Sequence, residues 1–353
     1  MTAEGGPALR TADFDYPLPE HLVASHPVDR RDESRLLVLD RETGSLADRG
    51  FPDLLEYLAE GDALVVNDTR VFPARLQGRK PTGARAEVLL LRPLPEDEEL
   101  RTWQALVRPG GKLKPGRVVD VSDSFHVVVE DSFADGSRRV RLEGEGDPWD
   151  LIERHGEVPL PPYIRRPGNA VDRERYQTIY AQERGSVAAP TAGLHFTAGL
   201  IEQVEAMGVS VVPVTLHVGV GTFRPVDAER VEDHRMHAEH FELSGGAARL
   251  LNRVREGGQR VWAVGTTSAR TLETAVSSDG SFGASNGWTD LFIHPPYRFR
   301  AVDGLLTNFH LPRSSLLMLV AALAGRDAVL EAYRHAVEQR YRFYSYGDAM
   351  LVV

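Results

Sequence analysis

The chain has 353 residues, no cysteine and a formal net charge of -10 at neutral pH. Its length is more typical of two domains than of one, and the missing cysteine excludes disulfides, thiolate metal sites, iron–sulfur clusters and a cysteine nucleophile. The excess of acidic residues disfavours non-specific adhesion to nucleic acid, because neutralising phosphates requires a local excess of lysine and arginine.

Strand and helix signals alternate in the amino-terminal part of the chain. Apolar runs over residues 36–40 and 63–68 predict strands, and an amphipathic run over residues 53–58 predicts a helix between them. From about Val71 the pattern changes to short β-type runs separated by proline and glycine turns, at residues 86–91, 102–107, 117–121, 125–130 and 138–144. Such spacing is typical of a small antiparallel sheet or barrel.

Helix and strand signals alternate again after a proline-rich connection over residues 158–167. The simplest interpretation is an insertion. We predict an α/β main domain, mixed α+β in detail, formed by residues 1–70 and 155–353. An all-β, barrel-like domain of residues 71–154 interrupts it.

Small residues precede a polar turn in the sequence GSVAAPTAGLHFT, residues 185–197. Thr197 is the predicted N-cap of the helix that follows. Small residues such as Gly193 let a ligand approach the backbone, while Thr191 and His195 supply a hydroxyl and a group able to exchange a proton near neutral pH. The alternative is a tight turn whose histidine only caps a backbone group.

A β-rich run over residues 209–226 predicts a buried strand that delivers a loop. His217 lies near the carboxyl end of this strand, where open α/β sheets usually place ligands. The loop contains Gly219, Gly221 and Thr222, which we predict to contact substrate. The two glycines do not complete a dinucleotide-binding motif, so we predict no Rossmann-type nucleotide site.

Three histidines lie three residues apart at His234, His237 and His240, beside Asp233 and Glu239. Imidazoles at this spacing share one face of a helix, which raises the possibility of a metal site. A solvated, partly helical segment explains the same pattern. We therefore predict no metal and favour acid–base or substrate contacts.

Two strand-turn-helix patterns follow. In the first, over residues 260–275, Thr266, Thr267 and Ser268 occupy the first helical turn. Free amides and hydroxyls there favour an anion, a tRNA phosphate or a carboxylate, and Arg270 would assist. Simple helix capping is the alternative; we predict ligand contact.

The second pattern places Asn308, His310 and Arg313 just before an apolar helix, an arrangement that suits the rim of a site. Upstream of it, Tyr297 and Arg298 are candidates to stack on a base and to hold a phosphate of tRNA. The alternative is that the aromatic residues of this segment belong to the core.

A locally basic stretch runs from Arg70 to Arg117, with 11 Lys/Arg against 5 Asp/Glu. Such a local excess can neutralise phosphates even in an acidic protein. The alternative is an ordinary solvated surface. Our candidate tRNA contacts in or beside this stretch are Arg70, Arg75, Arg79, Lys112 and Lys114.

Long and unusual strings occur in a fixed order: PTAGLHFT, TLHVGVGTFRPV, DHRMHAEHFE, AVGTTSARTLE, TDLFIHPPYRFR and LLTNFHLPRSSLLMLVAA. DFDYPLPEHLVASHP, RDESRLLVLDR, GDALVVNDTRVFPARL and LPPYIRRP precede or separate them, and YRFYSYGDAMLV ends the series. Together they resemble the S-adenosylmethionine:tRNA ribosyltransferase-isomerase family of queuosine biosynthesis. The resemblance covers nearly the whole chain except the first dozen residues and the variable loops of the β region.

This resemblance implies an α/β domain with an inserted β-barrel, and it implies a reaction. The ribosyl group of S-adenosylmethionine is transferred to 7-aminomethyl-7-deazaguanine at the wobble position of tRNA and isomerised, giving epoxyqueuosine and releasing adenine and methionine. S-adenosylmethionine is then a substrate, and no prosthetic cofactor is expected. We expect a cytoplasmic monomer whose partner is the precursor-bearing tRNA, with no membrane and no obligate protein partner.

The implied chemistry needs a base near the 5′ carbon of the ribose, which the sulfonium acidifies, and a proton donor for the departing adenine. We assign this work to His195 and His217, with His237 or Glu239 as alternatives. Two other functions are alternatives: a metal-dependent hydrolase that uses the three histidines, and a tRNA-binding module without catalysis. Small-residue turns followed by polar groups favour an enzyme.

Overall fold

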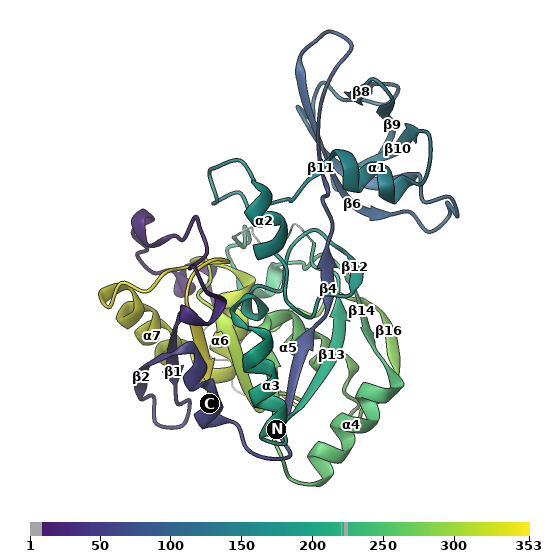
Figure 1. The fold of residues 1–353 in the computed structure, drawn as a ribbon. Helices are drawn as coiled ribbons and strands as arrows, with labels where there is room; N and C mark the ends of the chain where they lie inside the picture. The colour runs from purple at the N-terminus through teal and green to yellow at the C-terminus, as the bar shows by residue number, and fades with distance from the viewer. Residues whose placement is uncertain (1–8, 220, 222–224) are drawn as a thin grey trace.

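The computed structural model describes residues 9–219, 221 and 225–353 (Figure 1). Its main sheet has the strand order β16-β14-β13-β3-β15-β17-β18-β1-β2. The four central strands run parallel to one another: β13 (Ser210–Leu216), β3 (Ala63–Asn67), β15 (Val261–Val264) and β17 (Gly304–Asn308). The flanking strands are β14 (Glu239–Leu243), β16 (Ser285–Thr289), β18 (Ala349–Val352), β1 (Arg35–Leu39) and β2 (Leu46–Gly50).

Helices cover both faces of this sheet. One face packs on α4 (Gly245–Glu256), α5 (Gly265–Ala275), α6 (Ser315–Ala324) and α7 (Arg326–Glu338), and the other on α3 (Ala198–Ala206). Along β3, Ala63 and Val65 belong to the first core and Leu64 and Val66 to the second. Burial on both faces explains why the central strands are continuously apolar in sequence.

Local signals in the sequence set the ends of these helices. The Thr197 hydroxyl accepts a hydrogen bond from the Leu200 amide at 3.2 Å, which confirms the predicted N-cap of α3. Ser314 caps α6 through the Leu317 amide in the same way. The helix predicted over residues 53–58 is a 3-10 helix, η4 (Phe51–Tyr57).

The inserted part is a barrel with a core of its own. Its strands are β5 (Arg75–Arg79), β6 (Arg85–Pro93), β7 (Thr102–Arg108), β8 (Val118–Ser122), β9 (Phe125–Ser132) and β10 (Arg138–Gly144). They pair antiparallel, and the pairing of Arg79 with Asp120 closes the ring between β5 and β8. The expected fold class is confirmed.

After the last barrel strand the chain forms α1 (Pro148–His155), β11 (Gly156–Glu157) and α2 (Ala170–Arg175). Leu151 and Ile152 of α1 pack in the barrel core, and β11 pairs with β5. A two-stranded sheet of β4 (Thr69–Val71) and β12 (Glu183–Ser186) lies on the main-domain side. Figure 1 shows the barrel projecting from one end of the main domain. The domain boundaries at residues 70–71 and 154–155 stay a prediction.

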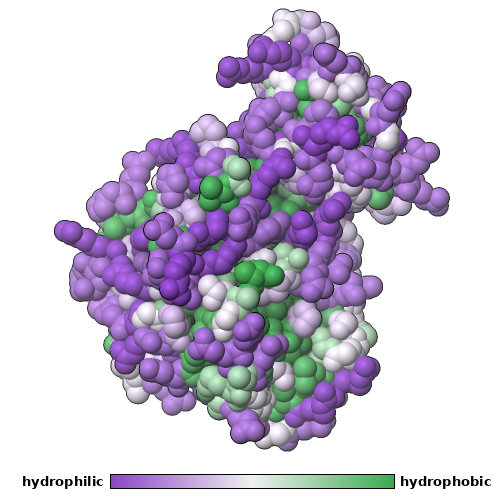
Figure 2. All heavy atoms as spheres, in the orientation of Figure 1, coloured by the Kyte–Doolittle hydropathy of each residue, from purple (hydrophilic) through white to green (hydrophobic). Residues whose placement is uncertain are grey.

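Polar residues predominate on the face of the molecule seen in Figure 2, and apolar residues gather in patches on the main domain. Among the described residues, no helix is long and apolar enough to cross a membrane.

The parallel direction of the central strands brings distant segments of the chain to one edge. After β3, β13, β15 and β17, the chain continues at Asp68, His217, Gly265 and Phe309. Because carboxyl ends of parallel strands meet at the same edge of a sheet, several of the predicted site segments lie there.

Candidate functional site

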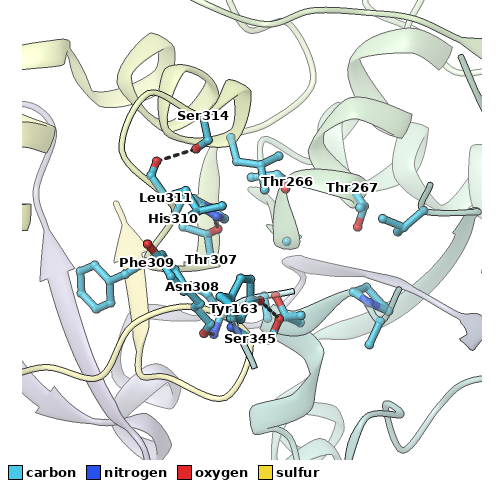
Figure 3. A pocket seen from close by; sticks show the side chains of 18 residues that line it. Tyr163, Thr266, Thr267, Thr307, Asn308, Phe309, His310, Leu311, Ser314 and Ser345 are labelled. Carbon is cyan, nitrogen blue, oxygen red and sulfur yellow. Dashed lines mark hydrogen bonds between the residues drawn. The ribbon is translucent and has the colours of Figure 1, made fainter. Parts of the chain in front are cut away.

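A pocket lies at this carboxyl edge of the sheet (Figure 3), and its mouth is open to solvent. Five predicted site residues line it: Thr191, Thr266, Thr267, Asn308 and His310. Of the residues that the structure describes, none that lines the pocket is an aspartate, glutamate, lysine or arginine.

Asn308, the last residue of β17, lines this pocket, and its side-chain amide has several partners. Its amide nitrogen Nδ2 lies 3.1 Å from Nε2 of His195, 3.1 Å from the Tyr344 carbonyl and 3.5 Å from the Asp348 carbonyl. These acceptors fix which end of the amide is nitrogen. The oxygen Oδ1 is buried and has no hydrogen-bond partner among the described residues. An unpaired buried acceptor is costly, so a ligand that donates a hydrogen bond would stabilise it.

His195 ends the 3-10 helix η5 (Thr191–His195) and lies behind Asn308, outside the pocket lining. Its Nδ1 is 2.7 Å from the Ser34 hydroxyl. Because Nε2 faces an amide donor, Nε2 accepts and Nδ1 carries the hydrogen. Burial, with the charge of Arg31 adding to it, lowers the pKa of His195 to about 3. His195 is therefore a neutral imidazole with both nitrogens engaged, so its predicted proton transfer is not favoured by these contacts.

His310 is the imidazole that lines the pocket. Its Nε2 lies 2.7 Å from the Thr307 hydroxyl, and burial lowers its pKa to about 3. The Tyr333 hydroxyl accepts from its backbone amide at 3.0 Å, and the Tyr16 hydroxyl donates to its carbonyl. The ring is thus held in a fixed position in its neutral form.

The start of α5 supplies hydroxyl groups to the pocket. Thr266 and Thr267 line it, and the buried Oγ1 of Thr267 has no partner within the described part of the chain. Ser268 differs, because its hydroxyl donates to the Val264 carbonyl at 2.8 Å and lies within the helix. The predicted ligand contact therefore fits the two threonines and not Ser268.

Arg270 and Glu239 form a buried ion pair away from the pocket lining. The second carboxylate oxygen of Glu239 accepts from the Gly219 amide at 2.8 Å, and Nε of Arg270 donates to the Leu291 carbonyl at 3.1 Å. The arginine predicted to assist an anion is thus paired with a carboxylate of the protein. Both side chains hold the loop after β13 in place, and neither contacts the pocket.

His217 follows β13 at the same edge of the sheet and is half-buried. Its Nδ1 lies 2.7 Å from the Thr69 hydroxyl, and a Cβ on Gly185 would lie 2.6 Å from its Nε2. Burial, and to a lesser extent the neighbouring His240, lowers its pKa to about 4. The adjacent Val218 lines the pocket and His217 does not.

The histidine-rich segment does not form the helix face that its spacing suggests. It contains a 3-10 helix, η7 (Val231–Asp233), and then β14. His234 packs on Phe292 and His240 on Trp288, so the rings point to different neighbours. No group of three potential metal ligands is found among the residues that the structure describes.

The glycine loop after β13 is described in part. His237 is exposed and would lie 2.8 Å from a Cβ on Gly221, whereas Thr222 falls outside the described residues. The Gly219 amide donates a hydrogen bond to the Glu239 carboxylate. The predicted substrate contacts of this loop stay predictions.

Two other predicted substrate contacts lie outside the pocket lining. A Cβ on Gly193 would lie 2.1 Å from the Tyr180 hydroxyl, so this glycine permits close packing against a tyrosine. Arg313 is exposed, has a positive φ of 57° and forms an ion pair with Asp15 at 3.2 Å. The contacts of both residues are with the protein itself.

The candidate tRNA contacts are spread over both domains. Arg75 donates to the Leu160 carbonyl at 3.1 Å, and the Tyr297 hydroxyl donates to the carboxylate of Glu273 at 2.9 Å. The other candidates are exposed: Arg70, Arg79, Lys112, Lys114 and Arg298.

Sequence reasoning missed residues that two loops add to the pocket. Tyr163 lines it and bonds to Ser345, while Tyr344 lines it with a positive φ of 70°. The strings LPPYIRRP and YRFYSYGDAMLV, which contribute to the family resemblance, contain these residues, but no motif within them predicts a role. Tyrosines clustered with proline, glycine and serine outside regular elements were the available signal.

A group of parallel strands with a largely apolar pocket at its carboxyl edge is typical of α/β enzymes that bind small organic molecules. Residues 11–352 match the family described as "Queuosine biosynthesis protein", and the chain belongs to this family.

The chain is similar to proteins named S-adenosylmethionine:tRNA ribosyltransferase-isomerase. That of Syntrophomonas wolfei is 53% identical over 98% of this chain and 97% of the relative. That of Symbiobacterium thermophilum is 53% identical over 98% of this chain and 100% of the relative. A crystal structure of S-adenosylmethionine tRNA ribosyltransferase from Thermotoga maritima is 40% identical, with a TM-score of 0.56, over 97% of this chain and 100% of that one.

Proposed function

We propose that this protein transfers the ribosyl group of S-adenosylmethionine to 7-aminomethyl-7-deazaguanine at the wobble position of tRNA and isomerises it. Epoxyqueuosine-tRNA, adenine and methionine are the products. The names of relatives that are 53% identical over 98% of the chain support this reaction. The observation that carries it is the pocket: two of its lining residues, Asn308 and Thr267, each have a buried polar atom without a hydrogen-bond partner among the described residues.

The uncharged lining of the pocket suits one part of S-adenosylmethionine. Burying an ammonium, carboxylate or sulfonium without a counter-charge is costly, whereas a neutral nucleoside needs only hydrogen bonds. Adenosine offers both donors and acceptors for such bonds. We therefore place the adenosine part in the pocket and the methionine part toward its opening to solvent.

Proton transfer requires a group that reaches the ligand. We assign it first to His310, because it is the imidazole that lines the pocket. His217, at the same edge of the sheet, is the second candidate. His237 and Glu239 lie outside the pocket lining, and Glu239 is already committed to Arg270.

The tRNA is the proposed macromolecular partner, and S-adenosylmethionine is a substrate and not a prosthetic group. Exposed cations on the barrel, Arg79, Lys112 and Lys114, are candidate phosphate contacts. Arg70 and Arg298 extend this set to the main domain. A cytoplasmic monomer stays the expected form.

The test is to incubate the purified protein with S-adenosylmethionine and tRNA that carries the precursor. Adenine is quantified by chromatography, and nucleosides from digested tRNA are identified by mass spectrometry. We expect adenine and epoxyqueuosine in equal amounts, and no epoxyqueuosine with tRNA that carries guanine instead. Failure to form epoxyqueuosine refutes the proposal. Activity that persists after chelator treatment removes the metal-dependent hydrolase from consideration.

A further inference from the structure

We infer that His195 is a positioning residue that holds the Asn308 amide so that its Oδ1 accepts a hydrogen bond from the 6-amino group of the adenine of S-adenosylmethionine. The inference rests on the proposed function. Beyond that function, it identifies the adenine 6-amino group as the part of the substrate that is recognised. Oδ1 of Asn308 is the recognising atom, and His195 keeps it in place.

The orientation of the amide follows from its surroundings. Nδ2 of Asn308 faces three acceptors, Nε2 of His195 and the carbonyls of Tyr344 and Asp348. If the amide turned over, Oδ1 would face two carbonyl oxygens and an imidazole lone pair, and every one of these contacts would become repulsive. Oδ1 therefore stays on the opposite side of the side chain, where no described residue donates to it.

His195 contributes to this arrangement through its tautomer. Ser34 lies 2.7 Å from Nδ1 and takes the hydrogen there, so Nε2 keeps its lone pair for Asn308. The ring stacks on Phe51 with the two centroids 5.0 Å apart, which fixes its plane. A protonated ring would direct an N–H at the amide N–H of Asn308. Burial of the ring next to Arg31 opposes protonation.

The backbone of Tyr344, whose carbonyl also accepts from Asn308, is held in a fixed conformation as well. Tyr344 has a φ of 70°, a left-handed conformation that is unfavourable for a tyrosine. Its amide donates to the Phe309 carbonyl at 3.1 Å, and its own carbonyl accepts from the Gly347 amide at 2.9 Å. This conformation directs the Tyr344 carbonyl at Asn308. The cost of a left-handed tyrosine next to a pocket is consistent with a functional constraint.

The chemistry of the acceptor selects the ligand group. An amide oxygen only accepts, so the ligand must supply an N–H or O–H donor. Among the described residues, none that lines the pocket is acidic, which disfavours the ammonium of the methionine part. The adenine 6-amino group is a neutral donor, and asparagine amides pair with that group in other recognition settings. A site built for this donor should discriminate against a purine that lacks it.

The test compares S-adenosylmethionine with its 6-deamino analogue, in which purine replaces adenine, by the kcat/KM for release of the base in the presence of precursor-bearing tRNA. For the unaltered protein we expect at least roughly a tenfold preference for S-adenosylmethionine, the value of one hydrogen bond. Asn308→Ala should reduce the preference to about one. Each ratio comes from one protein preparation, so partial misfolding cancels.

Variants of His195 separate positioning from other roles. His195→Phe keeps the stacked ring and removes the acceptor, so the preference should fall most of the way toward that of Asn308→Ala. His195→Gln supplies an amide oxygen near the position of Nε2 and should restore the preference. His21→Phe, at an exposed histidine, is the matched control and should keep it.

Each result that differs from these expectations overturns a different claim. Equal kcat/KM for the two substrates with the unaltered protein overturns the inference and leaves the proposed function intact. Release of neither base overturns the proposed function. A His195→Phe variant that keeps the full preference while Asn308→Ala loses it overturns the positioning role.

Discussion

The ion pair between Arg270 and Glu239 is expected to support the fold and the loop after β13. Arg270 is 4% exposed and Glu239 is 6% exposed. Replacing Arg270 with leucine leaves a buried carboxylate whose remaining bond is to the Gly219 amide, and it frees the Leu291 carbonyl. Breaking a buried pair from one side costs about 3–5 kcal/mol. We expect the free energy of unfolding to fall by about that amount.

Urea unfolding followed by circular dichroism measures this change. The matched control is Arg313→Leu, because Arg313 pairs with Asp15 on the surface and its side chain is 53% exposed. That change should cost less than about 1 kcal/mol. The double replacement of Arg270 and Glu239 by leucine should be less destabilising than the sum of the two single changes, since no charge is left buried.

One result would refute this reasoning. If Arg270→Leu unfolds at the same urea concentration as the unaltered protein but loses turnover of S-adenosylmethionine, Arg270 acts on substrate. The contact predicted from its place in the first turns of α5 would then be correct.

Three further outcomes are expected. Gly193→Ala should lower the free energy of unfolding by about 1–3 kcal/mol, because the added Cβ would lie 2.1 Å from the Tyr180 hydroxyl. Adding Tyr180→Phe to this variant should recover part of the lost free energy. An unchanged urea midpoint for Gly193→Ala would contradict this prediction. Burial lowers the pKa of His310 in the folded protein to about 3, below its ordinary 6.5, so the unfolded chain takes up a proton first and the free energy of unfolding falls as the pH drops below 6.5. His310→Gln should reduce the slope of the free energy of unfolding against pH by about 1 kcal/mol per pH unit, as measured by urea unfolding at several pH values. An unchanged slope would count against a neutral buried ring. Replacing Lys112 and Lys114 with glutamate should weaken tRNA binding and reduce its salt dependence by about two charges, whereas unchanged affinity in filter binding would move the tRNA surface elsewhere.

Sequence patterns predicted those parts of the pocket that depend on strand direction. The strand-turn-helix patterns at residues 260–275 and around Asn308 contain Thr266, Thr267 and His310, which line the pocket. The strands before both turns, β15 and β17, run parallel to each other, so both turns lie at the carboxyl edge of the sheet. Five barrel strands were predicted as well, while the polar strand β5 was missed because its sequence, RLQGR, lacks alternation.

Roles that depend on distant partners could not be predicted. His195 bonds to Ser34 and Asn308, which are 161 and 113 residues away in the chain, and nothing near His195 in sequence indicates either. Whether Arg270 faces a ligand or Glu239 depends on the order of strands in the sheet, since β14 lies beside β13. The same strand pairing removes the helix that the histidine spacing suggested.

The most direct test of the account is a crystal structure of the protein bound to S-adenosylmethionine. The account predicts adenine in the pocket at the carboxyl edge of the sheet, with its 6-amino nitrogen within about 2.7–3.2 Å of Oδ1 of Asn308. Adenine bound at another surface, with Oδ1 still unpaired, would contradict it.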